Sequence, residues 1–151
     1  MNIIRTDRTH PDFLALCYEL DLALDDASGG FENRKKYVPF NQSNTMDMVV
    51  ILYDEDIAIG CGAYRLHGNG ASEIKRMFVK DTYRGKGYGR VILQELIHAN
   101  KENGINRLIL ETGSILISAI SLYKKMGFEV IPNYPPYDKI SESVCMELII
   151  T

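Results

Sequence analysis

The first clear pattern along the chain is an apolar stripe with helical spacing. Apolar residues recur every three or four positions from Phe13 to Ala27, just after Pro11, and Ser28, Gly29 and Gly30 follow them. This spacing predicts an amphipathic helix that the two glycines end. Residues 31–47 are polar, which predicts a loop with a short helix around residues 33–37.

The next segments have the composition of β-strands. Residues 48–53, 57–66 and 72–79 are rich in apolar and β-branched residues, and the short polar segments 54–56 and 68–70 separate them. Strands joined by turns this short predict an antiparallel meander. Residues 2–5 are a candidate for a further short strand at the start of the chain.

The second half of the chain alternates between helical and strand-like segments. Residues 91–99 have the apolar content of a buried helix, residues 107–110 form a strand that ends at Glu111, residues 118–126 form a short helix, and residues 128–131 and 143–150 form two more strands. The order strand, helix, strand implies one parallel crossover. The predicted fold class is therefore α/β of the α+β type, with a mixed, mostly antiparallel sheet and helices on both faces.

Composition limits the classes of function. The chain has 151 residues and is 46% hydrophobic, which predicts one domain over residues 1–151. Lys and Arg number 17 against 20 Asp and Glu, a net charge of -3, which disfavours nucleic acid as a general partner. Three scattered cysteines without a CxxC or Cys–His spacing predict no metal site. Without a secretory apolar segment or a membrane-spanning run, we expect a cytoplasmic protein with no membrane partner.

The segment with the clearest chemistry is the glycine turn from Arg84 to Arg90, with the sequence Arg-Gly-Lys-Gly-Tyr-Gly-Arg. It connects a predicted strand to a predicted helix. Its glycines allow a sharp turn close to a ligand, and the first amides of a helix have no internal partner. With the cations Arg84, Lys86 and Arg90, these amides predict a phosphate site at the positive end of the helix dipole.

Three kinds of nucleotide site compete for this turn. A Walker loop requires Gly-x-x-x-x-Gly-Lys-[Ser/Thr], and the residue after Gly89 is not Lys, which excludes it. A dinucleotide fingerprint requires Gly-x-Gly-x-x-Gly. Gly85, Gly87 and Gly89 miss that spacing by one residue, although Glu111 stands where the ribose-binding acid is expected. The antiparallel first half and the single crossover disfavour this second alternative.

The third alternative is a coenzyme A loop. Arg84-x-x-Gly87-x-Gly89 resembles the pyrophosphate loop of the GNAT superfamily of N-acetyltransferases, Gln/Arg-x-x-Gly-x-Gly/Ala. Residues 73–79 resemble the fourth strand of that family, 110–113 and 119–128 its fifth strand and fourth helix, and 143–148 its last strand. The resemblance covers residues 73–148. The first half of the chain matches the family only in its pattern of elements.

The resemblance implies transfer of the acetyl group of acetyl-CoA to a primary amine of a small molecule or peptide, by direct attack in a ternary complex. The pyrophosphate is expected on the glycine turn and the pantetheine arm on the strand edge at residues 77–79. Leu116 departs from the family pattern, which often has Asn or Gln at that position. The implied cofactor-binding residues are Met77, Phe78, Val79, Arg84, Gly85, Lys86, Gly87, Tyr88, Gly89, Arg90, Leu116 and Ala119.

The resemblance also implies a general base and a general acid. Glu73 holds the family position of the base, which removes the amine proton directly or through water, and Tyr123 holds that of the acid, which protonates the leaving thiolate. A paired or solvated Glu73 and a core Tyr123 are the structural alternatives. Cys145 is expected to pack in the core. The other class of function that stays open is a non-catalytic CoA-binding or sensing module.

No motif identifies the acceptor amine. In this fold the first helix, the loop after it and the last hairpin build the acceptor cleft. Here these segments carry acids and tyrosines that suit a cationic acceptor: Asp21, Asp25, Asp26, Tyr37, Tyr134 and Tyr137. Solvation explains the acids equally well, and a homodimer stays open.

Overall fold

The structure is a computed structural model that describes residues 1–40 and 42–151. Asn41, which belongs to the predicted loop 31–47, lies outside the described residues. The helices and strands follow the chain in this order: β1 (Asn2–Thr6), α1 (Pro11–Ala27), α2 (Phe31–Arg34), the 3-10 helices η1 (Lys35–Phe40) and η2 (Ser43–Thr45), β2 (Met48–Asp54), β3 (Ile57–His67), β4 (Ala71–Val79), the 3-10 helix η3 (Asp81–Tyr83), α3 (Tyr88–Glu102), β5 (Arg107–Gly113), α4 (Ile117–Lys125), β6 (Glu129–Ile131) and β7 (Ser143–Ile149).

The predicted elements are confirmed, although most of their bounds differ by one to three residues. The sequence predicts a strand that ends at Glu111, but β5 continues to Gly113 because β7 pairs with it as far as Gly113 and Ser143. The short helix expected near residues 33–37 begins earlier, at Phe31, and continues as η1. None of the helices in the described part of the chain is both long and apolar enough to cross a membrane.

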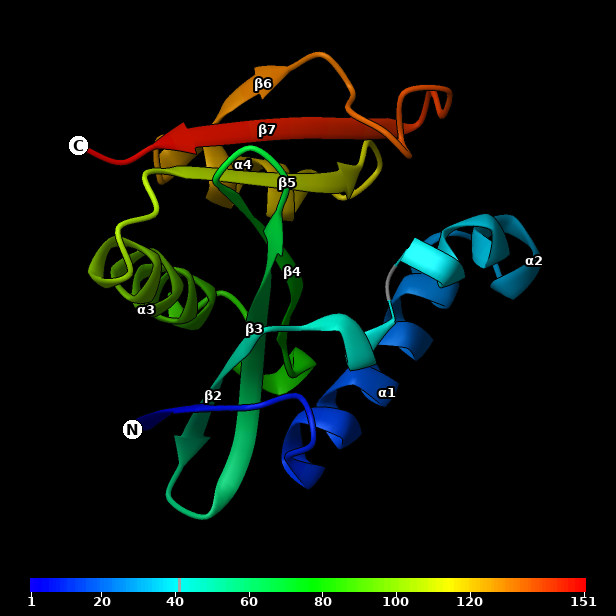
Figure 1. Cartoon of the computed structure of the whole chain (residues 1–151). Coiled ribbons are helices and arrows are strands. Elements are labelled where there is room, and N and C mark those ends of the chain that lie inside the picture. Colours follow the sequence, from blue (N-terminus) through cyan, green and yellow to red (C-terminus); the bar gives the residue numbers. More distant parts are fainter. Residues whose placement is uncertain (41) are drawn as a thin grey trace.

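The sheet has the strand order β1-β2-β3-β4-β5-β7-β6. Its pairs are antiparallel except β4 with β5, which confirms the mixed sheet with one parallel crossover. The parallel ladder is short: it joins Ala71–Glu73 to Arg107–Ile109 and then ends. Beyond Glu73 the two strands diverge, and Figure 1 shows the strands β5 to β7 running across the direction of β3 and β4. The sheet therefore opens in its middle.

A β-bulge in β4 lies beside this opening. Cys61 of β3 pairs with Phe78 and Ala63 pairs with Lys75, so the single residue Gly62 faces two residues of β4, Arg76 and Met77. Arg76 has a φ of 57°, in the left-handed region that a non-glycine residue rarely adopts. The extra residue bends β4 at the point where it leaves β5.

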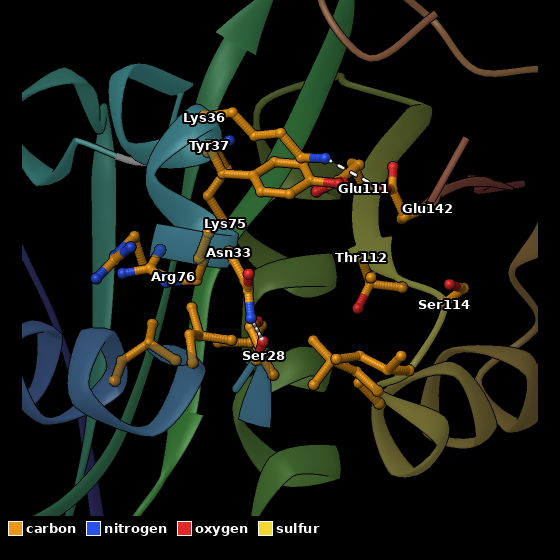
Figure 2. Close-up of a pocket in the computed structure, with 18 of the residues that line it drawn as sticks. Ser28, Asn33, Lys36, Tyr37, Lys75, Arg76, Glu111, Thr112, Ser114 and Glu142 are labelled. Atoms are coloured by element: carbon orange, nitrogen blue, oxygen red, sulfur yellow. Dashed lines mark hydrogen bonds and ion pairs between the residues drawn. The ribbon is translucent and has the colours of Figure 1, made fainter. Parts of the chain in front are cut away.

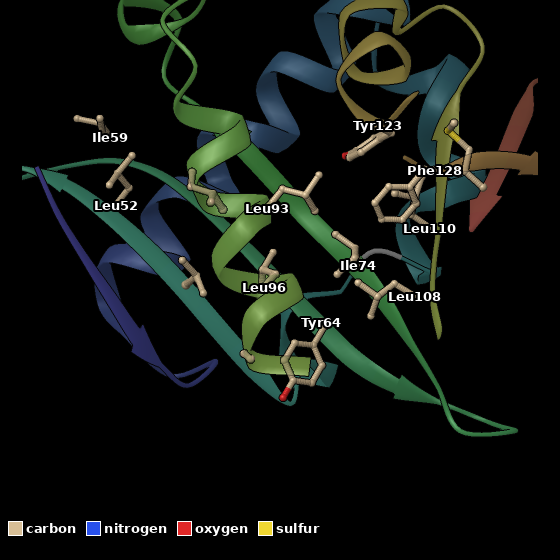
Figure 3. Close-up of a cluster of buried hydrophobic side chains, with 14 residues drawn as sticks. Leu52, Ile59, Tyr64, Ile74, Leu93, Leu96, Leu108, Leu110, Tyr123 and Phe128 are labelled. Carbon is tan, nitrogen blue, oxygen red and sulfur yellow. The ribbon is translucent and has the colours of Figure 1, made fainter. Parts of the chain in front are cut away.

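Helices cover both faces of the sheet, as predicted. On one face, α1 packs its apolar stripe of Phe13, Leu16, Cys17 and Leu20 on β2 and β3. On the other face, α3 places Ile92, Leu93 and Leu96 against strand residues from both halves of the sheet, and Tyr123 and Phe128 join this core (Figure 3). This second core spans the opening between β4 and β5, so it holds the two halves in place while the edge between them stays open.

Candidate active site

A cavity of about 720 Å³ lies where β4 and β5 diverge. Residues 74–77 of β4 form one wall and residues 111–116 of β5 and the following loop form the opposite wall. Figure 2 shows Lys36 and Tyr37 of η1 reaching across toward Glu111 and Glu142. The helix α4 contributes Ala119 and Tyr123. The opening of the sheet thus creates a chamber bordered by a strand edge, a carboxylate and a tyrosine.

Tyr123 places its ring in the core and is 7% exposed. The ring meets Phe128 edge-on, with centroids 5.8 Å apart. Among the described residues, the Tyr123 hydroxyl has no hydrogen-bond partner, although Tyr123 lines the cavity. Burial, and then the charge of Glu111, raises the pKa of Tyr123. The hydroxyl therefore stays protonated and can donate a hydrogen bond to a group in the cavity.

Glu111 is the carboxylate of β5 that lines the cavity. Its Oε2 accepts a hydrogen bond of 2.6 Å from the Ser143 hydroxyl, and its Oε1 has no hydrogen-bond partner among the described residues. Burial raises the pKa of Glu111, while the Ser143 hydrogen bond and then the charge of Lys75 oppose that rise. A raised pKa makes this carboxylate a better proton acceptor than an ordinary one, and Oε1 is open to a donor in the cavity.

Glu73 sits in a different environment. Its carboxylate is 1% exposed, accepts 2.8 Å from Nε of Arg65 and 2.7 Å from the Tyr134 hydroxyl, and lies 4.0 Å from Nζ of Lys75. Glu73 is not among the residues that line the cavity. Burial lowers the pKa of Lys75 to about 8, and its ammonium donates to the Tyr137 hydroxyl at 3.0 Å. The structure thus places Glu73 in a buried network behind the cavity wall.

The glycine turn forms the start of α3. Gly85 and Gly87 have φ values of 76° and 86°, which only glycine adopts readily. The first helical bond runs from the amide of Val91 to the carbonyl of Gly87, and α3 has neither a side-chain cap nor an acid in its first turn. Nε of Arg84 donates to the carbonyl of Val79 at 2.9 Å, which ties the turn to the end of β4. In the described part of the chain the amides of residues 85–90 donate no backbone hydrogen bond, as expected for the first amides of a helix.

Comparison with known proteins decides the family. The family model of the GNAT acetyltransferase domain matches residues 46–130, more than half of the chain. The chain belongs to the GNAT acetyltransferase family. The resemblance inferred from the glycine turn and the following segments is confirmed.

The relatives of this GNAT protein include an IAA acetyltransferase of Azospirillum brasilense, 38% identical over 90 residues, or 59% of each protein. An uncharacterised N-acetyltransferase of Bacillus subtilis is 32% identical over 96 residues, which are 62% of this chain and 64% of that protein. The chain thus spans less than two thirds of the length of these curated relatives.

Solved structures share the fold of this GNAT protein. A Klebsiella pneumoniae protein assigned as an acyl-CoA N-acyltransferase has a TM-score of 0.80 over 99% of this chain and 97% of that one, at 25% identity. A GNAT acetyltransferase of Elizabethkingia anophelis with acetyl-CoA bound has a TM-score of 0.70 over 99% and 97%, at 18% identity. At that identity, the second likeness is one of fold alone.

The cavity brings together part of the predicted site of this GNAT protein. Met77, Leu116, Ala119 and Tyr123 line it. Phe78 is 7% exposed and packs in the α1 core on the other face. The other predicted cofactor residues, Val79, Arg84, Gly85, Lys86, Gly87, Tyr88, Gly89 and Arg90, lie outside the cavity lining, at the end of β4 and the start of α3. That these residues and Glu73 serve acetyl transfer stays a prediction.

Two of the three acids expected around the acceptor pair with arginines of this chain. Asp21 accepts from Arg76 at 2.8 Å, and Asp25 accepts from Arg34 at 2.7 Å. Of the six residues named for the acceptor cleft, Tyr37 lines the cavity, whereas Tyr137 is fully buried. In residues 1–40 and 42–151 no group of three or more His, Cys, Asp or Glu is arranged to hold a metal ion. The expectation of a site without metal stays a prediction.

The sequence alone misses the residues that close the cavity from the far side. Lys36, Glu142 and Ser143 belong to no recognisable motif, and their contacts join positions more than 100 residues apart. The sequence marks Glu111 as a candidate only weakly, by its place at the end of the predicted strand 107–110.

Proposed function

We propose that this protein transfers the acetyl group of acetyl-CoA to a primary amine of a small molecule or peptide, by direct attack while both substrates are bound. The observation that carries the proposal is the cavity between β4 and β5, whose walls bear a strand edge, the Glu111 carboxylate and the Tyr123 hydroxyl. The family membership and the acetyl-CoA bound to a protein of the same fold support it.

The cofactor is expected to run from the start of α3 to the cavity. The amides before Val91, with no side-chain cap and no acid nearby, suit the negative charge of a pyrophosphate. Lys86 and Arg90 are exposed beside them and add positive charge. The edge of β4 beyond Glu73 is not paired with β5, so residues 77–79 can form a ladder with the amides of the pantetheine arm. Leu116 and Ala119 would then pack against that arm.

The reaction needs a proton acceptor, because an alkylamine is mostly protonated at neutral pH. We assign this role to Glu111, since it lines the cavity and keeps Oε1 free of protein partners. The neutral nitrogen attacks the thioester carbon and a C–N bond forms. The C–S bond then breaks, the thiolate leaves, and the nitrogen releases its second proton to solvent as the amide forms. The amide of Met77 is the candidate donor to the developing oxyanion, and Tyr123 the donor to the thiolate. Glu73, which the family resemblance implies as the base, stays the alternative.

Two measurements test the function. Acetyl-CoA should raise the melting temperature while NAD and ATP do so weakly or not at all, because a ligand bound only to the native state stabilises it. A panel of primary amines should then give CoA release with at least one acceptor. Stabilisation by NAD without any by acetyl-CoA would contradict the proposal. Stabilisation by acetyl-CoA without turnover on any amine would favour the non-catalytic CoA-binding module.

A pair of isosteric variants decides which carboxylate is the base. Glu111→Gln should lower kcat/KM most near neutral pH, and the loss should shrink as the pH rises, because a more basic medium supplies neutral amine without help. Glu73→Gln should give kcat/KM the same pH dependence as in the wild type. It removes the partner of Arg65 and Lys75, however, and so destabilises the fold. The reverse pattern would assign the base to Glu73.

A further inference from the structure

A short strap crosses the cavity on its acceptor side. We define the strap as η1, Lys35–Phe40. Nζ of Lys36 lies 3.1 Å from Oε1 of Glu142, and the Tyr37 hydroxyl lies 3.3 Å from Oγ of Ser143 (Figure 2 shows the first of these). Two neighbouring residues of the strap thus bind two neighbouring residues at the start of β7, across the opening of the sheet.

The second contact continues to Glu111. Ser143 is 5% exposed and donates its hydroxyl to Oε2 of Glu111 at 2.6 Å. A serine hydroxyl has one proton, and an ionised carboxylate can only accept. When Glu111 is ionised, the Ser143 proton is therefore committed to it, and the Tyr37 hydroxyl must be the donor in the 3.3 Å contact. The result is a directed chain from the strap to the carboxylate.

We propose that Ser143, oriented by Tyr37 of the strap, is a positioning residue that holds Oε2 of Glu111 and leaves Oε1 to receive the proton of the acceptor amine. This inference rests on the proposed function, since it assigns a partner to the base of that reaction. It adds residues that no motif indicates, and it makes the base depend on whether the strap is in contact with β7.

The electrostatic consequence has a definite sign. Burial raises the pKa of Glu111, and the hydrogen bond from Ser143 opposes the rise because it stabilises the anion. The other charged and titratable groups near Glu111 are Lys75 and Glu73 on β4, Tyr123 on α4, Cys145 on β7, Tyr137 in the loop before β7, and Tyr37 itself. Removing the Ser143 hydroxyl leaves these groups in place, so the pKa of Glu111 should rise.

The main test is the pH profile of kcat/KM for Ser143→Ala, measured with an amine that gives CoA release. A hydrogen bond to a charged group is strong, so we expect kcat/KM of this variant to fall by about tenfold at pH 6. At pH 8.5 the fall should be less than about twofold. Ser143→Thr, which keeps a hydroxyl, should have the wild-type ratio of kcat/KM at pH 6 to kcat/KM at pH 8.5. Tyr37→Phe should change the ratio in the same direction but less, because Ser143 keeps its bond to Glu111.

The matched control is Tyr53→Phe. It also removes a hydroxyl that a tyrosine donates to a carboxylate, but that carboxylate is Asp12, and neither residue lines the cavity. It should leave the ratio of kcat/KM at pH 6 to kcat/KM at pH 8.5 unchanged. A change in this ratio for Tyr53→Phe with none for Ser143→Ala would overturn the proposal. An equal loss at both pH values for Ser143→Ala would also overturn it, because it would indicate a structural role.

A readout without catalysis separates this inference from the proposed function. The carboxyl carbon of Glu111 can be followed by NMR in the protein alone and assigned with Glu111→Gln. Its titration midpoint should move to higher pH in Ser143→Ala and return in Ser143→Thr. An unmoved midpoint refutes the inference even if the wild type is an active acetyltransferase. A moved midpoint in a protein that transfers no acetyl group supports the contact and refutes only the proposed function.

Discussion

Gly62 is the position at which one methyl group should cost the most. It faces the bulge of β4, and a Cβ atom there would lie 2.6 Å from Sδ of Met77, 2.8 Å from Cδ1 of Leu96 and 2.9 Å from Cγ2 of Ile92. Leu96 and Ile92 are fully buried, so they have little room to retreat. Overpacking of this kind typically costs about 1–3 kcal/mol, and we expect Gly62→Ala to lower the free energy of unfolding by about 2 kcal/mol.

Gly68→Ala is the matched control, because a Cβ atom at Gly68 would meet nothing within 4 Å. The same change of residue there should be neutral or stabilising by up to about 1 kcal/mol, since alanine restricts the unfolded chain. Urea unfolding followed by circular dichroism measures both, and with a slope of about 2 kcal/mol per molar the Gly62→Ala midpoint should fall by about 1 M. Equal midpoints for the two variants would refute the packing argument at the bulge.

Three further predictions concern the site. Tyr123→Phe should keep the affinity for acetyl-CoA while kcat falls by about tenfold to a thousandfold, and steady-state CoA release beside a binding titration checks it; unchanged turnover would make Tyr123 a core residue only. Gly87→Val should abolish the stabilisation by acetyl-CoA, because its φ of 86° disfavours a branched side chain; an undiminished shift in melting temperature would remove the turn from the binding site. Lys75→Met should stabilise the protein at pH 7 by about 1–3 kcal/mol, because burial of the ammonium disfavours the charged form. Burial lowers the pKa of Lys75 from 10.5 to about 8. The cost of burying the ammonium is therefore complete below pH 8 and vanishes as the pH rises toward 10.5, so the stability gained by Lys75→Met should shrink over that range. A loss of stability at pH 7 would mean that the charge is needed beside Glu73 and Glu111.

The sequence predicts those features that short segments determine. The spacing of apolar residues gives the helices, the turns give the meander, and the glycines of the turn before α3 adopt the positive φ values that their type allows. Tyr123 lies on the predicted helix and lines the cavity. These are local properties, so one segment contains the information for each.

The remaining features depend on contacts between distant segments. The Tyr37–Ser143 contact joins residues 106 positions apart, and the Ser143–Glu111 bond joins residues 32 apart. No periodicity encodes such pairs. The bulge at Arg76 is hidden for a different reason, because an arginine with φ of 57° contradicts the usual preference of its residue type. The burial of Glu73 between Arg65 and Tyr134 likewise follows only once β3 and the loop before β7 are placed beside β4.

The short ladder between β4 and β5 has a consequence for the association of this chain with other chains. A strand edge with unpaired backbone groups ordinarily attracts strands of neighbouring molecules and promotes aggregation, and proteins usually cover such edges or shorten them. Here the unpaired edge lies in the middle of a seven-stranded sheet, recessed in a cavity whose far side the contacts of Lys36 and Tyr37 cross. A strand of a neighbouring molecule would have to displace these contacts before it could pair with the edge. An extended ligand inside the cavity can pair with it directly, so the fold keeps unpaired backbone groups for a ligand without presenting them on an outer edge of the sheet.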